Sequence, residues 1–280
     1  MTKVLLIGRG QVGSELAQRL RDVELHWWDA RIEDVSGEVL AAIKPDVVIN
    51  AAGKTDLRWC EENARDAFSA NVEAPVELFK RMLESDPRCR YIHLSSGCIW
   101  DGPFDDAGKP FEPLAAPSPA SYYAWTKAAC DALLLSIASD RVAILRPRQV
   151  YSSTYSPRNT LIKLLRYPQL IDTPNSMSSA DVIAKTVQHL LTASDWSGVY
   201  NVYDLGHTTP FEIGMMLYQA GLRDQPARIE KSELDTWHRP RRVDTVIHDE
   251  RFEAMIKPRD VHELLRESIA ELAKTHAVAQ

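Results

Sequence analysis

The N-terminal segment constrains the fold most strongly, because a short apolar run leads directly into a glycine-rich loop. Residues 4–7 are all apolar, and glycines follow at positions 8, 10 and 13. This spacing, between a buried strand and the start of a helix, is the context in which a glycine loop binds a dinucleotide. The glycines allow a tight turn, a close approach of the backbone to a pyrophosphate, and close packing of helix on strand. The loop residues that we expect to bind the cofactor are Gly8, Gly10, Gln11, Val12 and Gly13.

Strands and helices alternate through the first half of the chain. Short apolar runs predict strands over residues 4–7, 23–28, 46–50, 91–94 and 142–145. Helical spacing predicts helices over residues 11–21, 35–43 and 60–84, and a further helix that contains Tyr123 and Lys127. Pro75 is expected to mark a break or a new helix start. This alternation specifies an α/β fold, a Rossmann-type doubly wound parallel sheet with helices on both faces.

The alternation weakens beyond residue 150. We expect residues 1–150 to form the dinucleotide-binding domain and residues 151–280 to form mainly a small C-terminal substrate lobe. A strand near residues 198–203 is expected to return to the sheet, and Ser178 or Ser179 to cap a helix. Residues 101–119 contain five prolines, which predicts a long loop of the kind that is usually functional.

The composition is that of an ordinary globular protein and excludes several function classes. A formal net charge of -6 gives no electrostatic case for nucleic acid or an anionic membrane as a partner. The four cysteines form no C-x-x-C pair and the eight histidines show no ligand spacing, so we expect no metal site. No apolar run approaches the roughly 18 to 20 residues of a membrane span, and no signal peptide is evident. These features predict a cytoplasmic protein with reduced thiols.

An acidic residue follows the glycine loop at the position where a cofactor ribose would lie. Asp29 ends the second predicted strand, sixteen residues after Gly13. A carboxylate there would accept hydrogen bonds from the adenosine ribose, which favours NAD. Arg31, or Arg9 inside the loop, could instead contact the 2′-phosphate of NADP. The sequence therefore predicts NAD(H) or NADP(H) and leaves the choice between them open.

Ser96, Tyr123 and Lys127 form the candidate catalytic set. Ser96 follows the strand over residues 91–94, and ligands of an open parallel sheet bind beyond the carboxyl ends of its strands. Tyr123 and Lys127 are four residues apart on one helix face, where the lysine ammonium would favour the ionised phenol. A phenol with a lowered pKa can transfer a proton near neutral pH. Beside a dinucleotide site, this set indicates a hydride-transfer enzyme.

Together these motifs resemble the short-chain dehydrogenase/reductase superfamily, in its extended branch. Residues 44–53 look like the third strand of that family and its cofactor-lining turn, which adds Ala51, Ala52 and Gly53 to the expected cofactor contacts. Residues 94–102 look like the segment with the catalytic serine or threonine, and residues 146–151 like the strand end beside the nicotinamide.

Within the superfamily, three short motifs are most similar to the dTDP-4-dehydrorhamnose reductases: residues 10–13, residues 100–102 and Arg239-Pro240. Three features depart from that pattern. The glycine loop is one residue shorter, Gly97 stands where those reductases usually carry Asp, and residues 241–244 differ. The cofactor fold is expected to tolerate these changes, whereas the identity of the sugar is left open.

The resemblance implies a role for each catalytic residue. Tyr123 is the general acid that protonates a carbonyl oxygen as hydride arrives. Lys127 lowers the pKa of that phenol and bonds the nicotinamide ribose, and Ser96 polarises the reacting oxygen. The implied activity is an NAD(P)H-dependent reduction of a 4-keto (deoxy) nucleotide sugar, by a protein for which a homodimer is plausible.

Two other functions stay open at this point. An NAD-dependent nucleotide-sugar 4-epimerase would keep the same fold but return the hydride to the sugar. A non-catalytic NAD(P)-binding regulatory subunit is the alternative from another class, although a pure binder need not retain the proton donor Tyr123. For the substrate, arginine suits phosphate oxygens and aromatic rings suit a sugar or a base. The candidate substrate contacts are Trp100, Arg148 and Arg239.

Overall fold

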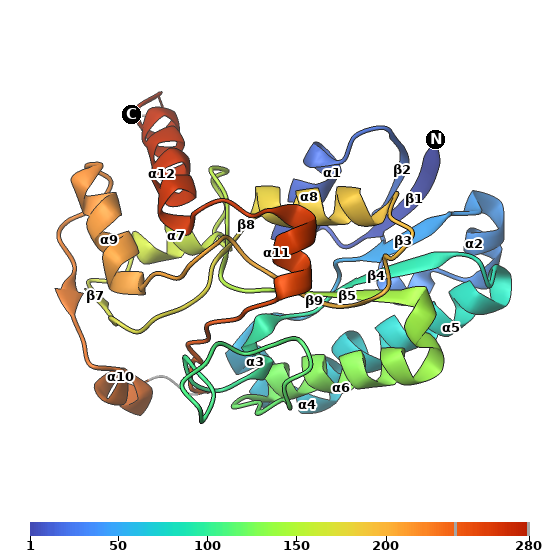
Figure 1. Ribbon diagram of the computed structural model, residues 1–280, viewed down its shortest axis with the longest axis horizontal. Helices are drawn as coiled ribbons and strands as arrows, with labels where there is room; N and C mark the ends of the chain where they lie inside the picture. The colour runs from blue at the N-terminus through green and yellow to red at the C-terminus, as the bar shows by residue number, and fades with distance from the viewer. Residues whose placement is uncertain (238–239, 279–280) are drawn as a thin grey trace.

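A six-stranded parallel sheet forms the centre of the molecule (Figure 1). The structure is a computed structural model that describes residues 1–237 and 240–278. The strands lie in the order β2-β1-β3-β4-β5-β9, and each neighbouring pair is parallel. Their bounds are β1 Thr2–Ile7, β2 Val23–Trp28, β3 Val47–Asn50, β4 Arg90–Leu94, β5 Val142–Pro147 and β9 Gly198–Val202. The predicted doubly wound parallel sheet is confirmed, and its strand order reverses direction between β1 and β3, where ligands of such sheets bind.

Helices cover both faces of the sheet, because successive residues of a strand point to opposite sides. In β1, Val4 and Leu6 pack into one apolar cluster and Leu5 and Ile7 into another. The first cluster is covered by α1 Gln11–Arg19, α8 Ala180–Leu190 and α11 Glu250–Ile256. The second is covered by α2 Gly37–Ile43, α5 Ala74–Ser85 and α6 Tyr122–Ala138. Figure 1 shows α1, α8 and α11 above the sheet and α5 and α6 below it.

The helical stretch before β4 is more divided than the sequence predicts. It consists of α3 Leu57–Glu62, α4 Ala64–Phe68, a π-helical turn over Ser69–Glu73, and then α5. Pro75 lies in the first turn of α5, as expected of a proline at a new helix start. The π turn was not predicted, since one extra residue in a helical turn leaves the apolar spacing almost unchanged. Single 3-10 turns occur at Ile32–Asp34, Gly97–Ile99 and Ser139–Arg141.

The second half of the chain contributes to the sheet and also forms a separate apolar cluster. Ser179 caps α8 by accepting a hydrogen bond from Val182 N at 3.1 Å, and β9 pairs with β5. The remaining elements are β6 Val150–Tyr151, α7 Thr160–Leu164, β7 Gln169–Leu170, β8 Ser178–Ser179, α9 Pro210–Gln219, β10 Ala227–Arg228, α10 Lys231–Trp237 and α12 Val261–Val278. Figure 1 shows α7, β7, α9, α10 and α12 at its left. The short helices α10 and α11 were not predicted, because two turns of helix give only a weak periodicity. None of the described helices has the length and apolar character that a membrane crossing requires.

Candidate active site

The glycine loop lies at the carboxyl end of β1 and packs against the segment that follows β3. Gly8 has a φ of +105°, and a Cβ on it would lie 2.6 Å from the Ala51 carbonyl carbon. A Cβ on Gly13 would overlap the Gly8 carbonyl oxygen, so α1 packs closely on the loop. Gly10 precedes α1 without a side-chain cap, and the Gln11 Nε2 atom is buried with no hydrogen-bond partner among the described residues. The free N–H groups and this unpaired amide suit an anionic group such as a pyrophosphate.

The turn after β3 is fixed by two buried asparagines. Asn50 Oδ1 accepts a hydrogen bond from Ala52 N at 3.0 Å. Asn71, in the π turn, accepts from Lys54 N at 2.7 Å and donates to Lys54 O at 3.0 Å and to Thr126 Oγ1 at 3.1 Å. Because Thr126 belongs to α6, Asn71 holds the predicted cofactor-lining turn against the helix that carries the catalytic candidates. The role of Asn71 was not predictable from the sequence, because the residue lies in the unpredicted π turn, a feature common at functional sites.

The candidate residues for the adenosine ribose lie at the end of β2. The Arg9 guanidinium lies 4.7 Å from the centre of the Trp27 ring and 3.7 Å from the Asp29 carboxylate. Arg31 instead pairs with Glu33 at 2.9 Å. Arg9 and Asp29 therefore lie together, whereas Arg31 pairs with Glu33.

The three candidate catalytic residues lie together where β4 ends and α6 begins. Tyr123 and Lys127 are buried, and Ser96 lies beside Tyr123, with its hydroxyl donating to Cys98 Sγ at 3.0 Å. Lys127 Nζ donates to Leu94 O at 2.9 Å, so the lysine is bonded to the strand that precedes Ser96. Ser121 begins the helix by accepting a hydrogen bond from Ala124 N at 3.2 Å. This cap fixes the first turn of α6 and hence the position of the phenol relative to the serine.

The protonation of Tyr123 differs from the sequence expectation. Burial raises the pKa of the Tyr123 phenol well above its ordinary value, and the nearby Ser96 hydroxyl and the Arg148 charge lower it by less. Lys127 is bonded to Leu94 O, so the lowering of the phenol pKa by this lysine stays a prediction. A neutral phenol is the form that can donate a proton to a reacting oxygen.

His93 lies behind Lys127 and was missed by sequence analysis. Its Nδ1 atom is 3.3 Å from Asn50 Nδ2, and its Nε2 atom is 3.2 Å from Lys127 Nζ and 3.7 Å from Cys130 Sγ. Burial, and then the Lys127 charge, hold the pKa of His93 well below its ordinary value. His93 is therefore a neutral ring that fixes the lysine from behind. A histidine inside the otherwise apolar run of residues 91–94 was the available signal.

A cavity of about 250 Å³ lies between α7, α9 and α10, in the second half of the chain. Its walls are mostly apolar, with Leu170, Ile171 and Ile213 among the lining residues. Polar groups at its boundary include Asn175 and Asp244. A mostly apolar cavity with a few polar groups is the usual form of a small-molecule site. Within the described ranges, no three His, Cys, Asp or Glu side chains gather as a metal ion would require.

Positive charge gathers between this cavity and the glycine loop. Lys163 and Arg242 line the cavity. Partial desolvation lowers the pKa of Lys163, whose surface is still exposed, and the nearby charges of Arg242 and Arg158 lower it further. Three neighbouring cations in an acidic chain favour the binding of an anion such as a diphosphate.

Comparison with known proteins identifies the family. The family model described as "RmlD substrate binding domain" matches residues 1–274. The chain belongs to this family. It is 28% identical over 225 residues to the bifunctional dTDP-4-dehydrorhamnose 3,5-epimerase/dTDP-4-dehydrorhamnose reductase of Arabidopsis thaliana, covering 75% of this chain and 72% of that protein. It is also 28% identical over 226 residues to the trifunctional UDP-glucose 4,6-dehydratase/UDP-4-keto-6-deoxy-D-glucose 3,5-epimerase/UDP-4-keto-L-rhamnose-reductase RHM3 of the same plant, and it spans only 33% of the length of that protein.

Solved structures share the fold of this RmlD family member. The L780 UDP-rhamnose synthase of Acanthamoeba polyphaga mimivirus superposes with a TM-score of 0.86 at 20% identity, covering 96% of this chain and 99% of that one. The dTDP-4-dehydrorhamnose reductase of Bacillus anthracis, solved in complex with NADP, gives a TM-score of 0.81 at 15% identity, with 98% and 99% covered. At these identities the likeness establishes the fold of the two halves together, from β1 to α12.

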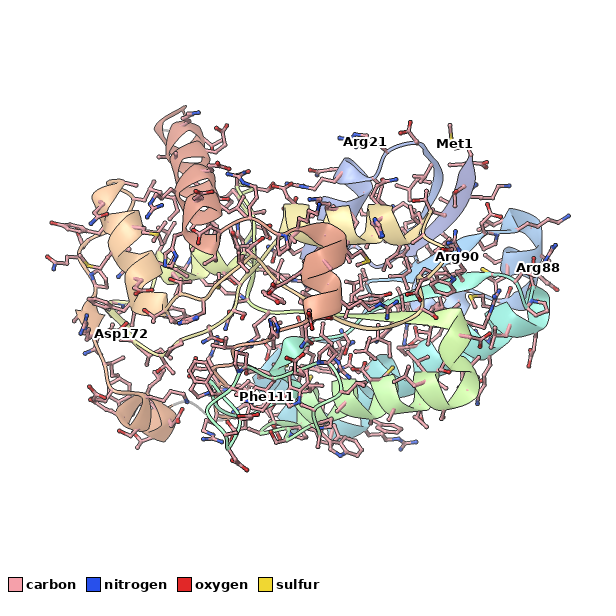
Figure 2. The ribbon with its side chains drawn as sticks, viewed as in Figure 1. Met1, Arg21, Arg88, Arg90, Phe111 and Asp172 are labelled. Atoms are coloured by element: carbon pink, nitrogen blue, oxygen red, sulfur yellow. The ribbon has the colours of Figure 1, made fainter. Side chains whose placement is uncertain are left out.

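The three residues of this family member that we expected to contact the substrate differ in where they lie. Trp100 is fully buried, stacks on Phe111 at 5.4 Å and lies beneath the Arg146 guanidinium at 5.2 Å. Phe111, labelled in Figure 2, belongs to the proline-rich loop, and the Trp100 Nε1 atom donates to Ala115 O of the same loop at 3.2 Å. The expectation that Trp100 contacts substrate is wrong, because loop and sheet enclose it. Arg239 lies outside the described residues.

Arg148 is the remaining substrate candidate and lies within the site. Its Nη2 atom donates to Asn175 Oδ1 at 2.8 Å and also to Val243 O, while its buried Nε atom has no partner among the described residues. Its Cδ atom lies 3.5 Å from the position that a Cβ on Gly97 would take. The resemblance leads one to expect Asp at position 97. Because this chain has Gly97 there, the Arg148 guanidinium has no neighbouring carboxylate from that residue.

Proposed function

We propose that this chain is an NAD(P)H-dependent reductase of a 4-keto (deoxy) nucleotide sugar. One observation carries the proposal: a buried Tyr123, beside Ser96 and one turn from Lys127, lies at the same sheet edge as the glycine loop. Membership of the RmlD family and the likeness to a plant protein named as a dTDP-4-dehydrorhamnose reductase support it. The chain spans only part of the multifunctional relatives, so only a reductase step is proposed.

We assign the cofactor to the glycine loop and the turn after β3. The N–H groups at the start of α1 would bind the pyrophosphate, and the backbone of Ala51, Ala52 and Gly53 would line the nicotinamide half. When bound, the nicotinamide supplies the hydride. Tyr123 would donate the proton to the carbonyl oxygen, and Ser96 would hydrogen-bond that oxygen. Lys127, fixed by Leu94 O and His93, would orient the cofactor ribose.

We assign the nucleotide part of the substrate to the cavity of the second half. Its apolar wall would contact the base, and Lys163 and Arg242 would bind the diphosphate. Arg148, with its unpaired Nε atom, lies between that cavity and Tyr123 and would contact the sugar. With the nucleotide in the cavity, the sugar would lie beside the phenol, which supports a nucleotide-linked sugar as the substrate.

The activity is tested by adding NADPH or NADH with a 4-keto-6-deoxy nucleotide sugar to the purified protein. We expect one nicotinamide oxidised for each sugar reduced. Tightly bound NAD that is not consumed, together with inversion at the sugar C4, would instead identify a 4-epimerase. Dinucleotide binding with no turnover of any keto sugar would identify a regulatory subunit.

Asp29 provides a prediction about the choice of cofactor. Asp29→Ala removes an acceptor for the ribose hydroxyls and frees Arg9, its partner at 3.7 Å, to contact a 2′-phosphate. The dissociation constant for NADH should rise by about 10-fold, whereas that for NADPH should stay equal or fall. Titration of both cofactors measures this, with Asp34→Ala as a control in the next turn. An unchanged ratio of the two constants would show that Asp29 does not contact the ribose.

We also propose that the protein is a cytoplasmic homodimer. The four cysteines are buried and unpaired, as suits a reducing compartment. Along α6, Trp125, Leu133 and Ile137 expose 45%, 43% and 36% of their surface, an apolar stripe that a second copy could cover. Sedimentation equilibrium should give twice the mass of one chain, and a mass of one chain at all concentrations would refute the dimer.

A further inference from the structure

Arg158 reaches the glycine loop from the second half of the chain. It belongs to the segment between β6 and α7, yet its Nη1 atom lies 3.3 Å from the position that a Cβ on Gly10 would take. Gly10 is the second glycine of the loop, whose missing side chain lets the backbone approach a pyrophosphate. The guanidinium therefore borders the space that a bound pyrophosphate would occupy.

The segment that carries Arg158 is bonded to α1 itself. Asn159 is fully buried, and its Nδ2 atom donates to Ser152 O at 2.7 Å and to Thr154 O at 2.9 Å. Ser152 Oγ donates to Glu15 Oε1 at 2.6 Å, and Glu15 lies on α1 directly after the glycine loop. These hydrogen bonds fix Ser152 and Asn159 relative to the glycine loop, and this keeps Arg158 close to Gly10.

The Arg158 charge has no acidic partner in the described part of the chain. Its backbone N–H donates to Ser156 Oγ at 3.3 Å, but its guanidinium makes no ion pair with residues 1–237 or 240–278. It lies near Lys163, whose charged form it disfavours. The exposed Arg158 guanidinium lies near other cations and near the free N–H groups at the start of α1. An anion bound there would contact both.

We propose that Arg158 is a positioning residue whose guanidinium donates hydrogen bonds to the pyrophosphate of the dinucleotide bound at the glycine loop. The proposal rests on the proposed function, because it requires a dinucleotide there. The pyrophosphate would then be held on one side by the start of α1 and on the other by a side chain from the second half of the chain. Cofactor binding would thereby fix the segment that leads into α7, on which Lys163 contacts the substrate cavity.

The diphosphate of the substrate is the competing ligand for this guanidinium. Lys163 and Arg242 line the substrate cavity, whereas Arg158 does not, and Arg158 approaches Gly10 instead. This division favours the cofactor for Arg158 and the substrate for the other two cations.

Calorimetric titration of the full-length protein tests the assignment. The variants are Arg158→Gln, Arg158→Lys and, as a matched control, Arg166→Gln, which removes an exposed arginine beyond α7. The probes are NADPH, NADH, ADP-ribose, AMP and dTDP. Loss of a charge-assisted hydrogen bond should raise the dissociation constants of Arg158→Gln for NADPH, NADH and ADP-ribose by about 10-fold each.

The other titrations separate this role from a general charge effect. AMP, which lacks the pyrophosphate, and dTDP should each change by less than about twofold, and Arg158→Lys should fall between the wild type and Arg158→Gln. The control should bind like the wild type. An unchanged affinity for ADP-ribose in Arg158→Gln, with an unchanged melting temperature, overturns the proposal. Weaker binding of dTDP alone also overturns it and assigns Arg158 to the substrate. Failure of the wild type to bind any dinucleotide refutes the proposed function itself.

Discussion

Tyr123→Phe should lower kcat by about 10³-fold, because it removes the only proposed proton donor while leaving the ring in place. The phenol is buried, and its raised pKa keeps the proton available at neutral pH. Since the substitution removes one hydroxyl and leaves the glycine loop unchanged, the dissociation constant for NADPH should change by less than about twofold. Single-turnover kinetics and a cofactor titration on the same preparation measure the two quantities.

Tyr122 offers a matched control for this variant. It is the adjacent phenol, and its ring stacks on Trp125 at 5.5 Å. Tyr122→Phe should keep kcat within about twofold of the wild type, since its hydroxyl has no proposed part in proton transfer. Wild-type turnover by Tyr123→Phe, or a loss of activity confined to Tyr122→Phe, would contradict the assignment of the general acid.

Gly13→Ala should abolish dinucleotide binding and destabilise the fold. The added Cβ would overlap the Gly8 carbonyl oxygen, and backbone cannot move aside as a flexible side chain can. We expect a loss of about 3 kcal/mol in the free energy of unfolding, the upper part of the range for an overpacked site. Dissociation constants for NADH and NADPH should rise by at least about 100-fold, because α1 must shift away from the loop. Urea denaturation and cofactor titration measure these effects.

Gly37→Ala separates the effect of crowding from that of losing a glycine. Gly37 is the first residue of α2, and a Cβ on it meets no atom within 4 Å. Alanine there should raise the free energy of unfolding by about 0.5 kcal/mol through the smaller entropy of the unfolded chain. Equal effects of Gly13→Ala and Gly37→Ala on the free energy of unfolding would show that the close contact between Gly13 and Gly8 does not determine the stability of the loop.

The parts of the structure that depend on local pattern could be predicted from the sequence. Strands such as residues 4–7 and 142–145 are short, apolar and bounded by turn residues, and the parallel sheet buries them on both sides. The glycine loop was predictable because each glycine meets a distinct steric requirement that the structure shows at Gly8 and Gly13.

The parts that depend on contacts between distant segments could not be predicted. Asn71 approaches Lys54 and Thr126 only because a π turn rotates it, and Arg158 approaches Gly10 across the fold. Trp100 resembles a ligand platform in the sequence but is enclosed by a loop whose path no local pattern specifies. The pKa of Tyr123 depends on burial, which the spacing of Tyr and Lys does not reveal.

The most direct test of the proposed reductase activity traces the hydride from the nicotinamide to the sugar. NADPH or NADH deuterated on the nicotinamide C4 is supplied with a 4-keto-6-deoxy nucleotide sugar, and the product is analysed by mass spectrometry and NMR. We expect one deuterium at the sugar C4 for each nicotinamide oxidised. Hydride transfer should be slowed about 10³-fold in Tyr123→Phe. A product without deuterium, formed while the cofactor stays reduced, would contradict the proposed reductase activity.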